Sequence, residues 1–242
     1  MKISDIVALN LWPDSKKTTT QKGILELEEL GYNLFYIGKN ADLYTCAGDE
    51  AKVLLVRSDR CSVFDIPLNL LIEGKGVSQT AISNNGAAFA KESGIRTAIL
   101  SEIVDQSLAI APRCQLMELC KPLEANVDGD IVQFELIFRN YLTGSLFDAC
   151  QNGSDPYGLD LPAGLEQWHK FETPIFTPTT KGIKDEPLNS AKVRELFPEI
   201  VTNLEKLFKD FTIFAEQRGI IVVDTKFEIF VNSKGEWVLG DE

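Results

Sequence analysis

The sequence predicts an α+β fold, and three features of its hydrophobic pattern support that prediction. Strand-like segments dominate the first half of the 242-residue chain. A long amphipathic helix comes late, over about 198–215, where apolar residues recur at helical spacing. Directly after it, the segment "IIVVDTKFEIF" (220–230) alternates in the way a strand does. Strands and helices are therefore largely segregated along the chain.

The first half begins with a short helix in "GILELEELG" and then becomes mainly strand. A second helix lies in "SQTAISNNGAAFAKESG" and is closed by Gly94. Asp128-Gly129 is a hairpin turn signal. A break near Cys120-Lys121-Pro122 divides a β-rich N-terminal lobe, 1–120, from a central lobe, 121–242. The predicted strands are, in order, "NLFYIG", "ADLYTC", "KVLLVRS", "TAILSEIV", "QLMELC" and "IVQFELIF".

The second half contains a short helix from "TGSLFDACQNG" and then a loop rich in Pro, Gly and Thr, from "GSDPYG" to "KDEPLNS". So long an irregular segment is usually functional or mobile. The long helix that follows is entered at Pro198 and stops at Gly219. Its apolar stripe predicts a core-facing helix with no further function.

Composition excludes several classes of protein. The formal net charge of -12 disfavours a nucleic-acid binder, which would normally present a basic surface. No apolar run approaches the roughly 18 residues of a membrane span, and the N-terminus lacks a signal core, so we expect a cytoplasmic protein. The five cysteines make no close metal-ligand pairs, which favours free thiols. His169 is the sole histidine, and we expect no catalytic role for it.

The strand at 220–230 raises a specific question, because one of its faces carries charge. Asp224, Lys226 and Glu228 share that face, whereas the other face is nearly all apolar. Either the charged face is solvated, as in many antiparallel sheets, or it is the floor of a cleft, as its apolar flanks suggest.

The turn sequence "VNSKGEW" folds this strand back as a hairpin. With an even-length loop centred on Ser233 and Lys234, Asp241 lies opposite Lys226 and diagonal to Glu228. Such carboxylates suit Mg²⁺, which takes one or two carboxylates and substrate phosphates. A three-residue loop would invert the register and break this argument.

Two further motifs could bind anions. In "FYIGKNADLY", Gly38 and Lys39 offer backbone N–H groups and a point charge, although the pair alone is weak evidence and favours an ordinary hairpin. In "FRNYLTGSL", Arg139 ends a strand and Thr143 to Ser145 open a helix, which could be either a phosphate site or a helix cap beside a surface arginine.

Taken in order, seven segments resemble the SAICAR synthetase family (phosphoribosylaminoimidazole-succinocarboxamide synthase) of purine biosynthesis. The likeness spans Phe35 to Glu242, and the segments are "IGKNADLY", "DRCSVFDIPL", "EGKG", "FRNYLTGSL", "PIFTPTTKG", "VDTKFEIF" and "VLGDE". The resemblance implies an N-terminal lobe like the nucleotide sites of kinases and ATP-grasp enzymes, with an ATP cleft between the lobes. It implies a ligase that joins carboxyaminoimidazole ribotide to L-aspartate, using ATP and Mg²⁺.

The resemblance also implies a set of site residues. They are Gly38, Lys39, Lys121 and Lys181 for ATP, Asp65, Arg139 and Ser145 for the substrates, Asp224 and Lys226 for catalysis, and Glu228 and Asp241 for the metal. The charged face of 220–230 would then be the active-site floor. The implied chemistry is attack by the ribotide carboxylate on the γ-phosphate, followed by displacement of the acyl phosphate by the aspartate amine.

The chain departs from the family pattern in two places. Ala41 stands where the first loop usually has a second basic residue, and family members usually continue beyond the Asp-Glu pair at which this sequence ends. These departures favour an alternative function, a non-catalytic relative that binds a nucleotide or the ribotide. Because the family is commonly dimeric, a homodimer is the expected assembly, with small-molecule substrates and with neither nucleic acid nor membrane as a partner.

Overall fold

The computed structural model describes residues 26–46, 48–63, 66–100, 104–182 and 184–240. The chain forms two compact units. The first takes in the chain up to Ala88, together with Thr97–Cys120 and Asn232–Glu236, and the second takes in Phe89–Arg96, Lys121–Val231 and the chain from Trp237. Among the described residues, no helix combines the length and the apolar character needed to cross a membrane.

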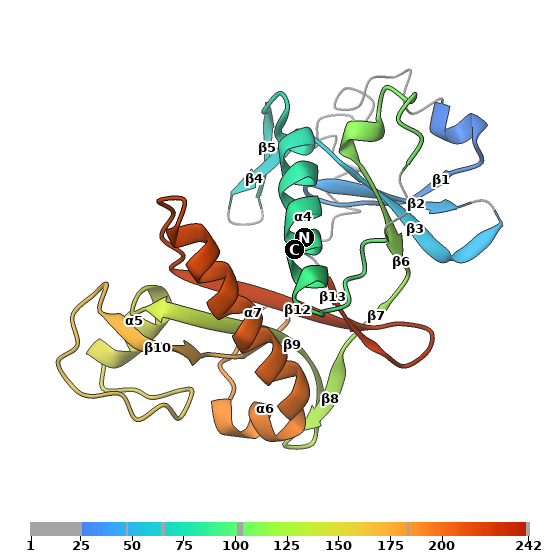
Figure 1. Cartoon of the computed structure of the whole chain (residues 1–242). Coiled ribbons are helices and arrows are strands. Elements are labelled where there is room, and N and C mark those ends of the chain that lie inside the picture. The colour runs from blue at the N-terminus through green and yellow to red at the C-terminus, as the bar shows by residue number, and fades with distance from the viewer. Residues whose placement is uncertain (1–25, 47, 64–65, 101–103, 183, 241–242) are drawn as a thin grey trace. The chain divides into compact units, whose positions relative to one another are not determined.

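The first unit is built on a four-stranded antiparallel sheet in the order β1-β2-β3-β6 (Figure 1). Its core gathers Leu27, Tyr44, Leu54 and Ile110. A separate hairpin, β4–β5, precedes the helix α4, whose last turn belongs to the second unit. The elements are β1 (Asn33–Ile37), β2 (Ala41–Cys46), β3 (Asp49–Arg57), β4 (Arg60–Val63), β5 (Ile66–Leu71), α4 (Lys75–Glu92), the short 3₁₀ helix η1 (Ala111–Arg113) and β6 (Cys114–Glu118).

Most of the strands predicted for this part of the chain are present, but the described residues of the one predicted at 97–104 form no continuous strand. The described residues of that segment form an isolated bridge between Ile99 and Met117, beside β6. Thr97 and Ile99 are buried there without a continuous ladder. A short apolar run shows that a segment is buried, and it cannot by itself distinguish a strand from another buried segment.

The second unit is a seven-stranded sheet in the order β10-β9-β12-β13, with β8 and β11 also paired to β9 and β7 paired to β12. The long strand β9 is its centre, and the helix α7 crosses the sheet (Figure 1). The elements are β7 (Lys121–Pro122), β8 (Glu124–Val127), β9 (Asp130–Tyr141), α5 (Gly144–Gln151), β10 (Lys170–Phe176), β11 (Thr179–Thr180), α6 (Ser190–Leu196), α7 (Pro198–Glu216), β12 (Asp224–Val231) and β13 (Trp237–Gly240).

The two faces of this sheet differ. Alternate residues of β9 pack against α7, and Phe138 is fully buried with its ring stacked on Phe176 at 4.9 Å and on Phe208 at 6.0 Å. From β12, Phe227 and Ile229 join the same core. The predicted apolar face of β12 and the core-facing stripe of α7 are therefore confirmed. The opposite face of the sheet carries the polar side chains.

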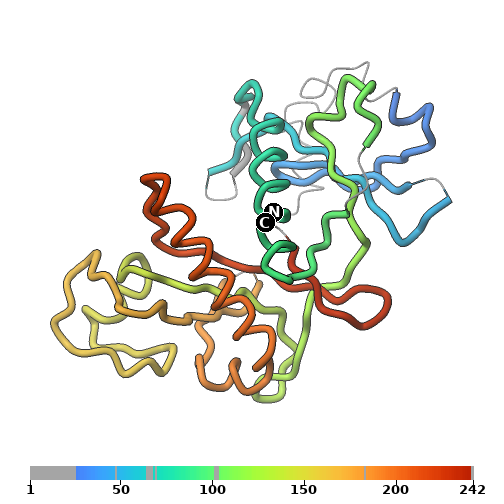
Figure 2. Tube along the Cα trace, in the orientation of Figure 1, coloured from blue at the N-terminus to red at the C-terminus, as the bar shows by residue number. Residues whose placement is uncertain are grey.

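The prediction of a continuous loop between the short and long helices is wrong, because β10 and β11 lie within it. Figure 2 shows the chain leaving α5, looping out through 152–169 and returning along β9 as β10. Pro174 stands in β10, which is the edge strand of the sheet. A proline cannot donate a ladder hydrogen bond and is tolerated at an edge, so the proline-rich composition concealed a strand.

The predicted register of the last hairpin is also wrong. Val231 pairs with Trp237 and Glu228 with Gly240, so the loop has an odd length. The Asn232 side chain accepts hydrogen bonds from the Lys234 and Glu236 amides, and Gly235 has a φ of 78°. A three-residue turn ending in a left-handed glycine is a common hairpin loop, and Gly235 supplies that conformation without a Cβ clash.

Candidate active site

The polar face of the second unit is assembled by the register between β9 and β12. These strands are antiparallel, and the pairing sets Asp224 opposite Arg139 and Glu228 opposite Glu135. Because directly opposed residues share a face, Lys226 lies on the same side as all four. The pairing thus brings together side chains about 90 positions apart in the sequence, in a single row across two strands.

Arg139 is fixed at one end of this row by two hydrogen bonds. Its Nε donates to Thr177 Oγ1 at 3.0 Å, and its Nη1 donates to Asp224 Oδ2 at 2.8 Å. Thr177 is fully buried and Arg139 nearly so, whereas the Asp224 side chain is 39% exposed. The guanidinium is therefore held in one plane with a partly open carboxylate beside it.

The other end of the row is a chain of alternating charges. Lys226 Nζ lies 2.6 Å from Glu135 Oε1 and 3.2 Å from Glu228 Oε1, and Lys181 pairs with the second oxygen of Glu228. Burial by itself would lower the pKa of Lys226, but the hydrogen bond and charge of Glu135, aided by Glu228, outweigh it and raise that pKa. The ammonium is thus charged across the physiological range.

Three residues at this site were not predicted from the sequence. Glu135 is part of the row, and Thr177 and Thr179 form hydrogen bonds to it. Thr179 Oγ1 donates to Glu135 Oε2 at 3.3 Å, and both residues are buried. A signal for Glu135 was available, because Gln133, Glu135 and Arg139 recur at even spacing along β9. No comparable signal exists for the two threonines, whose positions depend on strands hidden in the proline-rich segment.

Ser145 lies in the first turn of α5, whose N-cap residue is Thr143. The predicted helix start is therefore confirmed, and Ser145 is exposed there, six residues after Arg139. Lys121 forms one residue of β7, opposite Val231, and is exposed. Asp65 and Asp241, predicted for the substrate and the metal, lie outside the described residues.

Gly38 and Lys39 join β1 to β2 in the first unit. The Gly38 amide donates to Ala41 O at 2.8 Å, and a Cβ added at Gly38 would approach that oxygen to 2.7 Å. Beneath the turn, Arg60 is completely buried, pairs with Asp42 and donates to Gly38 O at 2.9 Å. Lys39 is exposed on this tightly held turn.

Residues 34–242 match the family model of SAICAR synthetase. That is most of the chain, and it includes every residue of the row just described. The chain belongs to the SAICAR synthetase family.

Individual SAICAR synthetases agree with this assignment. The phosphoribosylaminoimidazole-succinocarboxamide synthase of Desulfotalea psychrophila is 30% identical over 213 residues, covering 81% of this chain and 68% of that protein. The corresponding protein of Halorhodospira halophila is 34% identical over 221 residues, covering 86% and 72%. The SAICAR synthase of Saccharomyces cerevisiae, solved in complex with SAICAR, superimposes with a TM-score of 0.70 at 28% identity and covers 87% of this chain and 73% of that one.

The polar row of this SAICAR synthetase family member can be tested for its fit to a divalent cation. Among the described residues, no three His, Cys, Asp or Glu side chains gather into a complete metal site. Glu228, however, is 5% exposed, and both of its carboxylate oxygens face ammonium groups. Carboxylate oxygens suit Mg²⁺, which completes its shell with water and substrate phosphates, and a cation bound at Glu228 would replace at least one of these ammonium groups.

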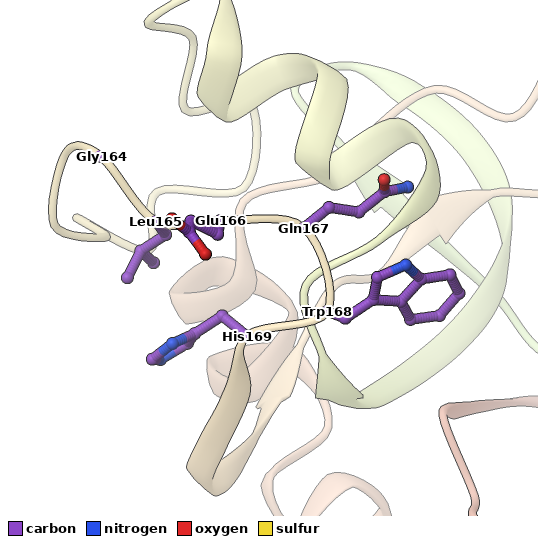
Figure 3. A pocket seen from close by; sticks show the side chains of 6 residues that line it. All are labelled: Gly164, Leu165, Glu166, Gln167, Trp168 and His169. Atoms are coloured by element: carbon purple, nitrogen blue, oxygen red, sulfur yellow. The ribbon is translucent and has the colours of Figure 1, made fainter.

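His169 lies elsewhere in the second unit, in the segment that borders a shallow cavity of about 390 Å³ lined by 164–169. Figure 3 shows its imidazole and the indole of Trp168 extending from that segment in different directions. The ring contacts Phe171, and the backbone carbonyl accepts a hydrogen bond from the Leu142 amide. These contacts tie the segment to the end of β9.

Proposed function

We propose that this chain is an ATP-dependent ligase of purine biosynthesis that joins carboxyaminoimidazole ribotide to L-aspartate to give SAICAR, ADP and phosphate. The observation that carries this proposal is the row formed by Arg139, Asp224, Lys226 and Glu228. In a member of this family, that row offers an anion-binding fork, two carboxylates and an ammonium on one sheet face.

The proposed reaction has two displacements. The ribotide carboxylate attacks the γ-phosphorus of ATP and ADP leaves, which gives an acyl phosphate. The amine of aspartate then attacks the acyl carbon, phosphate leaves, and the amine loses a proton. Little covalent chemistry is required of the protein, so positioning and electrostatic stabilisation account for most of the rate.

On the substrate side, Arg139 and Ser145 bind the ribotide phosphate, and Asp65 contributes to the same site. Two features support this assignment: the guanidinium is held in a fixed plane, and the helix α5 begins at Gly144, five residues further along the chain. Asp224 accepts the proton that the amine releases, and Lys226 offsets charge that develops on the transferred phosphoryl group. The partly exposed carboxylate of Asp224 and the raised pKa of Lys226 support these two roles.

On the nucleotide side, Gly38 and Lys39 cover the ATP phosphates, Lys121 lies by the adenine and Lys181 binds phosphate oxygens. The tight turn at Gly38 and the exposure of Lys39 support the first of these roles. Glu228 and Asp241 hold Mg²⁺, which when bound neutralises phosphate charge. Because the predicted register that set Asp241 opposite Lys226 is wrong, the assignment of Asp241 to the metal rests on the family resemblance alone.

A coupled assay for ADP release tests the proposal, with the ribotide and aspartate omitted in turn. Release that requires both substrates is the expected result, and Asp224→Asn should abolish it. Glu216→Gln is the matched control, because it makes the same carboxylate-to-amide change in the exposed pair of Glu216 with Lys170. Saturable nucleotide or ribotide binding without dependent ADP release would instead favour a non-catalytic relative. The homodimer and the cytoplasmic location stay predictions.

A further inference from the structure

Glu135 lies outside the set of residues to which the proposed reaction assigns a role, yet it is one of the most constrained groups in the second unit. It is 5% exposed, in the middle of β9. One carboxylate oxygen lies 2.6 Å from Lys226 Nζ, and the other accepts a hydrogen bond from Thr179 Oγ1 at 3.3 Å. A buried carboxylate with both oxygens engaged is held in one orientation.

Lys226 can therefore pair with either of two carboxylates, those of Glu135 and Glu228. It lies 2.6 Å from Glu135 but 3.2 Å from Glu228, whose other oxygen is paired with Lys181. The Lys181 side chain is 41% exposed and can turn into solvent, whereas Lys226 is anchored by the closer carboxylate. If Glu228 turns toward a divalent cation, Lys226 still has an anionic partner.

We propose that Glu135 is a positioning residue that retains Lys226 and so leaves Glu228 available to bind the divalent cation. The inference rests on the proposed function, in which Glu228 holds Mg²⁺. Without the negative charge of Glu135, two ammonium groups face the one carboxylate of Glu228. A divalent cation then has to displace an ammonium whose other carboxylate neighbour on the strand, Asp224, is already paired with Arg139, and it meets a net positive charge.

The first test is a titration of Mn²⁺ alone into the whole protein, with free and bound Mn²⁺ monitored by electron paramagnetic resonance. Mn²⁺ shares the oxygen-ligand preference of Mg²⁺ and is detected directly. Glu135→Gln keeps the shape of the side chain and removes its charge, and we expect its dissociation constant for Mn²⁺ to rise at least about fivefold, the lower end of usual coupling between sites. Glu216→Gln should leave the dissociation constant unchanged.

The second test asks whether the effect runs through Lys226. In a Lys226→Met background the competing ammonium is absent, so Glu135→Gln should weaken Mn²⁺ binding by less than it does in the unmodified chain. Glu135→Asp, which keeps the charge, should restore most of the affinity. A merely structural role for Glu135 would lower the melting temperature of both Glu135 variants and leave Mn²⁺ affinity below the transition unchanged.

The outcomes separate this inference from the function on which it rests. Equal losses from Glu135→Gln in both backgrounds, or no loss in either, would overturn the inference while substrate-dependent ADP release by the unmodified protein would uphold the function. Absence of any saturable Mn²⁺ site in the unmodified protein would overturn the inference directly. Absence of substrate-dependent ADP release by the unmodified protein would count against the proposed function, whatever the Mn²⁺ titrations show.

Discussion

The substitution Arg139→Lys tests whether Arg139 binds the ribotide phosphate or ATP. Arg139 donates hydrogen bonds in two directions, and a single lysine ammonium cannot reproduce both. The two donors, Nε to Thr177 at 3.0 Å and Nη1 to Asp224 at 2.8 Å, belong to one rigid plane. A lysine keeps at most one of these bonds. A hydrogen bond to a charged group contributes roughly 1.5–3 kcal/mol, and the 39% exposure of the Asp224 side chain favours the lower end.

We therefore expect Arg139→Lys to lower the free energy of unfolding by about 1–2 kcal/mol and to weaken ribotide binding about tenfold or more. ATP affinity should stay nearly constant, since in the proposed site Arg139 does not contact ATP. Titration calorimetry on each ligand measures both affinities, and urea unfolding measures stability. Thr177→Val is the control, because it removes the Nε acceptor but leaves the guanidinium in place. Equal losses for ATP and ribotide would show that Arg139 supports the fold, and unchanged ribotide affinity would refute the phosphate assignment.

Three further predictions concern the first unit. Lys39→Met should reduce the stabilisation by MgATP, which at 100 times the dissociation constant is about 2.7 kcal/mol for the unmodified chain, and thermal unfolding with and without MgATP measures the change. Gly76→Ala should cost about 1–3 kcal/mol in urea unfolding, because the added Cβ would lie 2.5 Å from Arg57 O, and unchanged stability would contradict that contact. Burial opposes ionisation of Asp59, but hydrogen bonds from Arg113 and the Gly76 amide outweigh it and lower the pKa of Asp59. The ionised form of Asp59 thus stabilises the fold above about pH 4, and this stabilisation is lost as the pH falls. The difference in free energy of unfolding between the unmodified chain and Asp59→Asn, measured by urea titration, should therefore become smaller below about pH 4.

The sequence was informative wherever a local period decided the structure. Alternation over 224–231 predicted one apolar and one charged face of β12, and Phe227 and Ile229 do enter the core. The same alternation failed over 220–223, because the chain leaves α7 through a turn and joins the sheet only at Asp224. Ile221 is accordingly 68% exposed, although it was assigned to the apolar face.

No local sequence pattern could predict how strands far apart in the sequence pair with each other. The contact between Arg139 and Asp224 depends on a register between strands 85 residues apart. Since a slip of one residue would move every side chain to the other face, only the packed core of the sheet determines that register. The hairpin shows the same limit at short range, because Gly235 selected a three-residue turn where a two-residue turn had been expected.

The charge balance of the polar row gives a reason why a ligase of this kind would need a cation. Three basic groups, Arg139, Lys181 and Lys226, are paired with three carboxylates, those of Asp224, Glu135 and Glu228. The row is therefore neutral as a whole, although each group in it is charged. An anionic nucleotide and an anionic ribotide can approach such a face only if carboxylate charge is offset from outside or basic groups are released from their partners. In the proposed site a divalent cation at Glu228 would do both, since it would neutralise that carboxylate and free Lys181 for phosphate oxygens, while Glu135 would keep Lys226 in its place.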